Sequence, residues 1–184
     1  MVSICLQSTA EEIHQIKDLQ TKYLKTNLSE NEQLSEGFLT ASYTEEFLNL
    51  MNSYYPAILA KNENQVVGYA LVATKEIRGK HELLDDLIQH CDKVTYNGQQ
   101  LSERPYVIVG QLCVAKPYRG QGIAQRLYKH FRHTLDDRFD CCITDIDQNN
   151  PRSLKAHLKS GFEIVGALNY GDANWNLVLW NWNL

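Results

Sequence analysis

The sequence predicts a mixed α/β domain in which helices cover a central sheet. Strand-like and helix-like patterns alternate along most of the 184 residues, and hairpins are expected toward both ends. In the middle, a strand, a loop, a helix and a second strand follow one another, which requires two strands to pair in parallel. No linker, repeat or low-complexity run interrupts the chain, so residues 1–184 are predicted to form a single domain.

The first part of the chain predicts strands and amphipathic helices in turn. Thr9 and Glu12 form a T-x-x-E capping box before apolar residues at helical spacing. Short polar residues at Asn62–Asn64 separate two apolar runs and predict a hairpin. The expected elements are a strand at Ser3–Gln7, helices at Ala10–Lys25 and Thr44–Asn52, and strands at Ala57–Lys61 and Gln65–Thr74.

The remaining elements follow from the same periodicities. Residues Lys80–Cys91 have helical spacing, and the Asn97-Gly98 pair after them indicates a turn. Gly161 is placed to end a helix. The expected elements are strands at Tyr106–Val114, Cys141–Ile146, Glu163–Leu168 and Asn174–Asn181, and helices at Gly122–Asp136 and Pro151–Ser160.

Composition excludes several function classes. Lys and Arg number 18 against 22 Asp and Glu, a net charge of −4, which gives the chain no reason to bind nucleic acid. No apolar run approaches the roughly 20 residues of a membrane-spanning helix. Since the first residues also lack the pattern of a secretory signal, a cytoplasmic location is expected, with no membrane partner.

The five cysteines form an odd set without C-x-x-C spacing. Neither a disulfide framework nor a structural zinc site is therefore expected, and no metal is assigned. Cys113 could accept an acyl group as a thiolate. However, it lies within an apolar strand, which raises the pKa of a thiol, so we interpret it as a core residue.

A glycine-bearing loop between a strand and a helix is the clearest candidate binding site. Gly120 and Gly122 let the backbone approach a ligand, and the helix that follows presents unpaired N–H groups and a positive dipole end. An anion such as a pyrophosphate fits there. The alternative is that these glycines only form a tight turn.

Two motifs in this region resemble the GNAT acetyltransferase superfamily. Arg119, Gly122 and Ala124 match an R-x-x-G-x-A acyl-CoA-binding motif, and Asn150–Phe162 resembles the superfamily's next segment. The resemblance covers nearly the whole chain, with an insertion at about residues 75–104. It implies a mostly antiparallel sheet whose parallel central strand pair splays into a V, with acetyl-CoA as cosubstrate.

The resemblance also implies which residues bind the cosubstrate. The strand before the loop would bind pantetheine through the backbone of Leu112, Cys113 and Val114. Loop amides would hold the pyrophosphate, from the residues Arg119, Gly120, Gln121, Gly122, Ile123, Ala124 and Gln125. Asn150 would contact the pantetheine or adenine-side arm, with Ser153 beside it.

Two catalytic residues are implied with alternatives. His157 stands where the family commonly has a tyrosine that protonates the leaving thiolate, and a histidine can do so near neutral pH. Its alternative role is to hydrogen-bond a carbonyl on a helix. Asp145 occupies the place of an acidic general base, with Asp147 on the same face of the strand. The alternative for Asp145 is a solvated carboxylate at a strand end.

Three functions remain open at this stage. The first is direct transfer of an acetyl group from acetyl-CoA to a primary amine, and the second is a non-catalytic acyl-CoA-binding or regulatory module. The third is an unrelated α/β domain. The acceptor would be a small-molecule amine or a protein amino group, with the small molecule slightly favoured. Oligomeric state is undetermined, with a homodimer through the terminal strands as one option.

Overall fold

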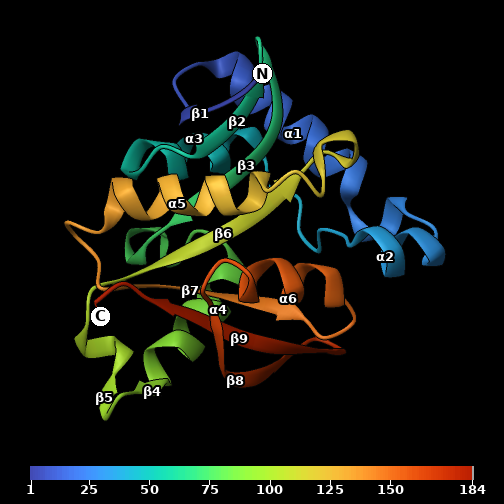
Figure 1. The fold of residues 1–184 in the computed structure, drawn as a ribbon. Helices are drawn as coiled ribbons and strands as arrows, with labels where there is room; N and C mark the ends of the chain where they lie inside the picture. The colour runs from blue at the N-terminus through green and yellow to red at the C-terminus, as the bar shows by residue number, and fades with distance from the viewer. Residues whose placement is uncertain (184) are drawn as a thin grey trace.

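A seven-stranded sheet in the order β1-β2-β3-β6-β7-β9-β8 forms the centre of the molecule (Figure 1). The computed structural model describes residues 1–183. Within them, neighbouring strands pair antiparallel except β6 and β7, which are parallel. The predicted fold class, a mixed sheet with a central parallel pair, is therefore confirmed.

The element bounds agree closely with the sequence patterns. The helices are α1 (Ala10–Tyr23), α2 (Glu30–Glu36), α3 (Glu45–Tyr54), α4 (Glu82–Lys93), α5 (Ile123–Leu135) and α6 (Pro151–Leu158). The strands are β1 (Val2–Leu6), β2 (Ile58–Asn62), β3 (Gln65–Ala73), β4 (Thr95–Tyr96), β5 (Gln99–Gln100), β6 (Tyr106–Val114), β7 (Cys141–Asp147), β8 (Glu163–Tyr170) and β9 (Ala173–Asn181). Every predicted helix and strand is present, with ends displaced by at most two residues.

Two features were not predicted. Helix α2 has no buried residue, so no hydrophobic periodicity marks it. The β4–β5 hairpin pairs only two residues of each strand, and the sequence indicated its turn but not its strands. With α4, this hairpin fills the segment between β3 and β6 that was expected to be an insertion.

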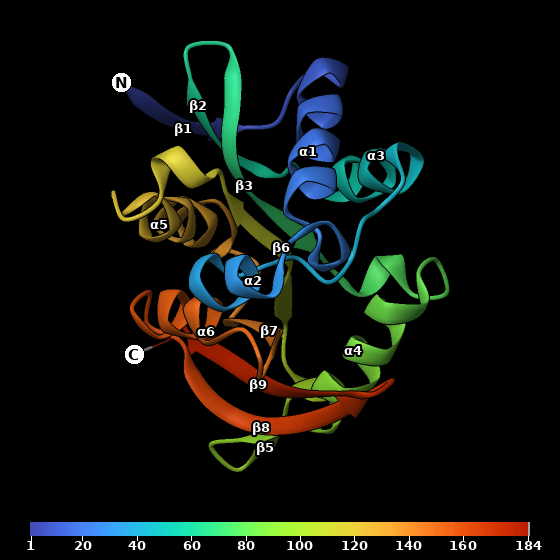
Figure 2. The same ribbon diagram turned by 90° about the vertical axis from the view of Figure 1, so that its right-hand side faces the viewer.

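Helices cover the two faces of the sheet (Figure 2). Helices α5 and α6 lie on one face, and α1, α3 and α4 lie on the other. The core is continuous across the sheet, with Tyr69, Ile108, Leu127 and Ile143 among its fully buried members. Among residues 1–183, no helix combines the length and apolar character needed to cross a membrane.

Strands β6 and β7 separate after a short parallel contact. They pair only from Tyr106–Cys141 to Ile108–Ile143. One residue later, the Thr144 hydroxyl donates a hydrogen bond of 2.9 Å to the carbonyl oxygen of Val109. A register shift against β3 follows, at the position of Gly110. Beyond it, the edge of β6 that faces β7 has no strand partner, which opens the sheet into the predicted V.

Candidate functional site

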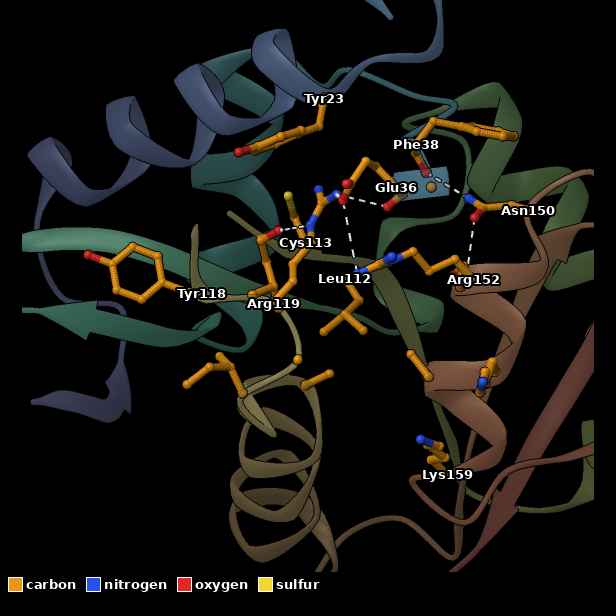
Figure 3. A pocket seen from close by; sticks show the side chains of 18 of the residues that line it. Tyr23, Glu36, Phe38, Leu112, Cys113, Tyr118, Arg119, Asn150, Arg152 and Lys159 are labelled. Atoms are coloured by element: carbon orange, nitrogen blue, oxygen red, sulfur yellow. Dashed lines mark hydrogen bonds and ion pairs between the residues drawn. The ribbon is translucent and has the colours of Figure 1, made fainter. Parts of the chain in front are cut away.

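A cavity of about 690 Å³ lies where β6 and β7 diverge. Its walls come from the end of β6, the loop into α5, the start of α6, and the segment between α1 and α3 (Figure 3). Of the predicted binding residues, the cavity is lined by Leu112, Cys113, Val114, Arg119, Gly120, Gly122, Ile123, Ala124, Gln125, Asn150 and Ser153. Gln121 is exposed and does not line it; its side-chain amide donates instead to the carbonyl of Pro117.

The amides at the start of α5 are free to bind a ligand. The first backbone hydrogen bond into the helix runs from Arg126 N–H to Gly122 C=O. Among residues 1–183, the N–H groups from Gly120 through Gln125 donate to no protein acceptor. Gly120 and Gly122 have φ angles of +76° and +73°, which glycine adopts without strain. This cluster of amides at a helix N-terminus suits a pyrophosphate.

Arg119 contributes to the site through its side chain. Its own N–H bonds the carbonyl of Lys116, so this amide is not among the free ones. The guanidinium stacks on the ring of Tyr23, 4.7 Å from the centroid, and its Nε donates to the Val114 carbonyl at 2.7 Å. Nη1 donates to both the carbonyl and the carboxylate of Glu36. Arg119 therefore braces the loop against β6 and α2.

Asn150 is placed at the cavity wall but its amide is already in use. Its Oδ1 accepts from the N–H of Ser153 at 3.2 Å, which caps α6, and its Nδ2 donates to the carbonyl of Phe38 at 2.9 Å. A ligand would compete with these bonds. Asn150 thus ties α6 to the segment after α2.

Two lysines on α6 supply positive charge that the sequence did not single out. Lys155 and Lys159 line the large cavity, and neither forms an ion pair within residues 1–183. On the sequence alone they are indistinguishable from a solvated helix face. Their position near the free amides suits further phosphate groups of a ligand.

A second, smaller cavity of about 80 Å³ adjoins the first. Phe38, Leu39, Leu112, Asn150 and Ser153 line both. The remaining wall of the small cavity combines apolar and polar side chains and comes from α4, β9 and His157 of α6 as well as from β6 and β7. It includes the leucines of α4, the ring of Trp175, and the carboxylates of Asp145 and Asp147. The two cavities therefore meet at the point where the sheet opens.

Asp145 and Asp147 have different surroundings although both face the small cavity. Asp147 is buried, its carboxylate 3.2 Å from Lys25 Nζ and bonded to the N–H of Asn149. Within residues 1–183, no side chain forms an ion pair or hydrogen bond with the Asp145 carboxylate. Burial raises the pKa of Asp145 to about 6, which suits a proton acceptor at neutral pH.

The His157 ring lies in an aromatic cluster with Tyr128 and Phe162. Its Nδ1 is 2.8 Å from the Ser153 carbonyl, an acceptor, so Nδ1 carries the proton and Nε2 does not. Burial lowers the pKa of His157 to about 4, so the ring is neutral at pH 7. These contacts favour the alternative of a histidine bonded to a helix carbonyl, since a neutral ring with a bare Nε2 has no proton to donate there.

The five cysteines are free thiols, and Cys113 is buried in β6. Burial raises the pKa of the Cys113 thiol to about 12, so it is not a thiolate at neutral pH. Within residues 1–183, no group of three or more His, Cys, Asp and Glu side chains could hold a metal. The chemistry of the site therefore resides in backbone amides, cations and the Asp145 carboxylate.

Comparison with solved structures shows the same fold. The NatC complex bound to Gag peptide and CoA has a chain 14% identical with a TM-score of 0.66, and the match covers 98% of each chain. Arabidopsis thaliana NAA60 in complex with acetyl-CoA is 13% identical with a TM-score of 0.66, covering 98% of this chain and 99% of that one. The Escherichia coli ribosomal-protein-S18-alanine N-acetyltransferase is 11% identical with a TM-score of 0.65, covering 100% of this chain and 96% of that one.

Comparison of the sequence with families of proteins gives a direct assignment. No curated protein matches the chain. The sequence model of the acetyltransferase (GNAT) family matches residues 16–162, which include α5, α6 and the whole of the splayed strand pair β6 and β7. With both motifs inside that match, the chain belongs to the acetyltransferase (GNAT) family.

Proposed function

We propose that this protein transfers an acetyl group from acetyl-CoA directly to a primary amine in a ternary complex. One observation carries the proposal: the free amides from Gly120 through Gln125 open into a cavity of about 690 Å³ in the splay of the sheet. A diphosphate can bind these amides while the attached arm runs along β6 toward the small cavity. Two of the similar structures have CoA or acetyl-CoA bound, which supports this assignment.

The roles of the residues follow from their positions. The N–H of Ala115 donates to Val67, so Ala115 and Cys113 turn their backbone groups toward β3, whereas Leu112 and Val114 turn theirs toward the unpaired edge of β6. The backbone of Leu112 would therefore bond an amide of pantetheine, as an added strand would. The Val114 carbonyl already accepts a hydrogen bond from Arg119 and is therefore not free to bind pantetheine. Lys155 and Lys159 would offset the charge of the phosphates.

Acetyl transfer then requires a neutral amine next to the thioester. The amine nitrogen forms a bond to the thioester carbonyl carbon and releases a proton to solvent, the C–S bond breaks, and CoA leaves as a thiolate. Asp145 would accept the proton of the ammonium, directly or through one water, because its pKa of about 6 leaves it ionised at pH 7. We assign His157 a structural role and leave the thiolate to take its proton from solvent, since the ring is neutral with a bare Nε2.

The acceptor is a primary amine of a small molecule or of a protein. The small cavity, with about 80 Å³ and the Asp145 carboxylate, admits an amine and little more. The names of two similar structures, which mention a Gag peptide and an alanine of ribosomal protein S18, support a protein or peptide amino group as acceptor.

The test is acetyl-CoA-dependent release of thiol by the purified protein, measured with a panel of small amines and of peptides with free N-termini. We expect saturable turnover with at least one acceptor and a product acetylated on nitrogen. CoA binding measured by calorimetry without any turnover would favour the non-catalytic binding module. Absence of CoA binding would refute both functions.

A further inference from the structure

Helix α2 is attached to the molecule by polar contacts and not by a hydrophobic face. None of its seven residues is buried, and Leu34 is 65% exposed. Its N-terminus is closed by its own capping box between Ser29 and Glu32. In Figure 2 the helix lies in front of β6 and β7, at the side where the sheet opens. Its position therefore depends on the two hydrogen bonds that Gln33 donates to the carbonyls of Lys25 and Leu28, and on contacts at its C-terminal end.

The carboxylate of Glu36 is the centre of those contacts (Figure 3). It lies 3.1 Å from Arg119 Nη1, 3.6 Å from Lys116 Nζ and 4.0 Å from Arg152 Nη2. Arg152 also donates to the Ser35 carbonyl at 2.7 Å. One anion thus faces three cations, which leaves an excess of positive charge around it.

These groups belong to the wall of the large cavity. Glu36, Arg119 and Arg152 all line it, close to the free amides of α5. A polyanionic ligand in this cavity would approach the cations that the Glu36 carboxylate now neutralises. Because two anions on the same cations repel each other, ligand and carboxylate compete for them.

The chain after Glu36 connects this cluster to the small cavity. Gly37 has a φ of +75°, and a Cβ at this position would lie 2.8 Å from Asn150 Oδ1, so the chain passes tightly against α6. The next two residues, Phe38 and Leu39, line both cavities. Phe38 and Leu39 are themselves held in place, by Asn150 and by backbone hydrogen bonds to Tyr23 and Lys25, so a change of partners at Glu36 is confined to α2.

We propose that Glu36 is a positioning residue that holds α2 over the cleft by taking the place of a ligand anion. Phosphate groups of the bound cosubstrate displace its carboxylate from Arg119, Lys116 and Arg152. This inference rests on the proposed function, because the anion it invokes is the diphosphate of CoA. The change is driven by the stronger binding of the phosphates to these cations once the Glu36 carboxylate has left them.

The first test is CoA binding by Glu36→Gln, measured by titration calorimetry. We expect about 3- to 10-fold tighter binding at low salt, because the competing charge is gone. Glu30→Gln is the matched control: Glu30 is exposed on the same helix and forms no ion pair within residues 1–183, so its affinity should stay within about 2-fold of wild type. The affinity of Glu36→Gln for CoA should also fall more steeply with salt than that of wild type. In wild type, salt weakens the attraction of CoA to the cations, but it also weakens the competing attraction of the Glu36 carboxylate.

The second test is hydrogen exchange of the wild-type protein, which needs no variant to fold. CoA should accelerate exchange in residues 30–36 while slowing it at the start of α5. Unchanged or weaker CoA binding by Glu36→Gln, or slower exchange in α2 with CoA, would overturn the inference. If either result is found while the wild type binds CoA and turns over, the proposed function stands and only the role of Glu36 is refuted. A wild type that binds no CoA refutes both.

Discussion

The hydroxyl of Thr144 donates a hydrogen bond to the carbonyl of Val109, at the point where two parallel strands part. The strands pair one residue earlier, at Ile108 and Ile143, and not beyond. The side chain thus satisfies the first carbonyl that the lost strand pairing leaves, in a buried position. It lets the sheet open without leaving a buried acceptor unpaired.

Replacing Thr144 with valine should therefore lower the free energy of unfolding by about 1–3 kcal/mol, since it leaves the Val109 carbonyl buried without a donor. Urea denaturation measures the change. Thr144→Ser keeps the hydroxyl and should lose less than Thr144→Val. Equal loss in the two variants would mean that the methyl group, and not the hydrogen bond, stabilises this position.

Replacing Gly122 with valine should abolish CoA binding in calorimetry. The φ of +73° strains a side chain, and a relaxed loop would turn the amides away from the ligand. Gly79→Val is the matched control, because Gly79 has a φ of +71° with no atom near its Cβ position and does not line the large cavity. Both variants should lose similar stability. Loss of CoA binding in both would show that strain alone, and not the loop amides, explains the effect.

Asp145→Asn should lower kcat by about 10²- to 10⁴-fold with little change in CoA affinity, if the carboxylate accepts the amine proton. In wild type, kcat/KM should rise as the pH passes about 6, and the variant should lose this limb. Stopped assays from pH 5 to 9 measure both. Retention of the limb in the variant would assign it to another group.

The same substitution should stabilise the protein at pH 8. Burial raises the folded-state pKa of Asp145 to about 6, above its ordinary value, so its contribution to stability is complete below about pH 4 and is lost as the pH rises through 6. Removing the charge should therefore recover about 1–3 kcal/mol at pH 8. By contrast, Asp147→Asn should destabilise the protein, because it leaves Lys25 without its partner. Thermal unfolding of both variants distinguishes the two carboxylates.

His157 should contribute to stability with the opposite dependence on pH. Its folded-state pKa is lowered to about 4 by burial, so its contribution is complete above about pH 6.5 and is lost as the pH falls through 4. His157→Gln keeps a donor for the Ser153 carbonyl and does not titrate. Between pH 7 and 4, wild type should lose about 2–3 kcal/mol more stability than this variant. A large fall in kcat with an unchanged unfolding profile would instead support the role of a catalytic acid.

The sequence predicted the elements that bury an apolar face, and it predicted the loop amides through their glycines. Helix α5 buries Leu127, Tyr128 and Phe131, so its periodicity is clear. Helix α2 buries nothing, and its contacts join Glu36 to Arg119 and Arg152 across much of the chain. Ion pairs of this kind have no period, so only the structure reveals them.

The site could be predicted in part for a related reason. The motifs identified Asn150 and Arg119 as residues of the cleft. They did not reveal that the two side chains already donate hydrogen bonds to the carbonyls of Phe38 and Val114. Lys155 and Lys159 carry no sequence signal, since lysines on an exposed helix face are ordinary. Which partner a polar side chain takes depends on segments brought together by folding.

The common wall of the two cavities has a practical consequence for inhibitor chemistry. Since Phe38, Leu39 and Leu112 border both, the linker of a covalent conjugate of CoA with an amine would pass beside these three side chains on its way from one cavity to the other. Joining the two ligands makes the second contact intramolecular, which raises its effective concentration. A series of such conjugates with different amine arms would report the shape of the acceptor through affinity alone, with no need for turnover.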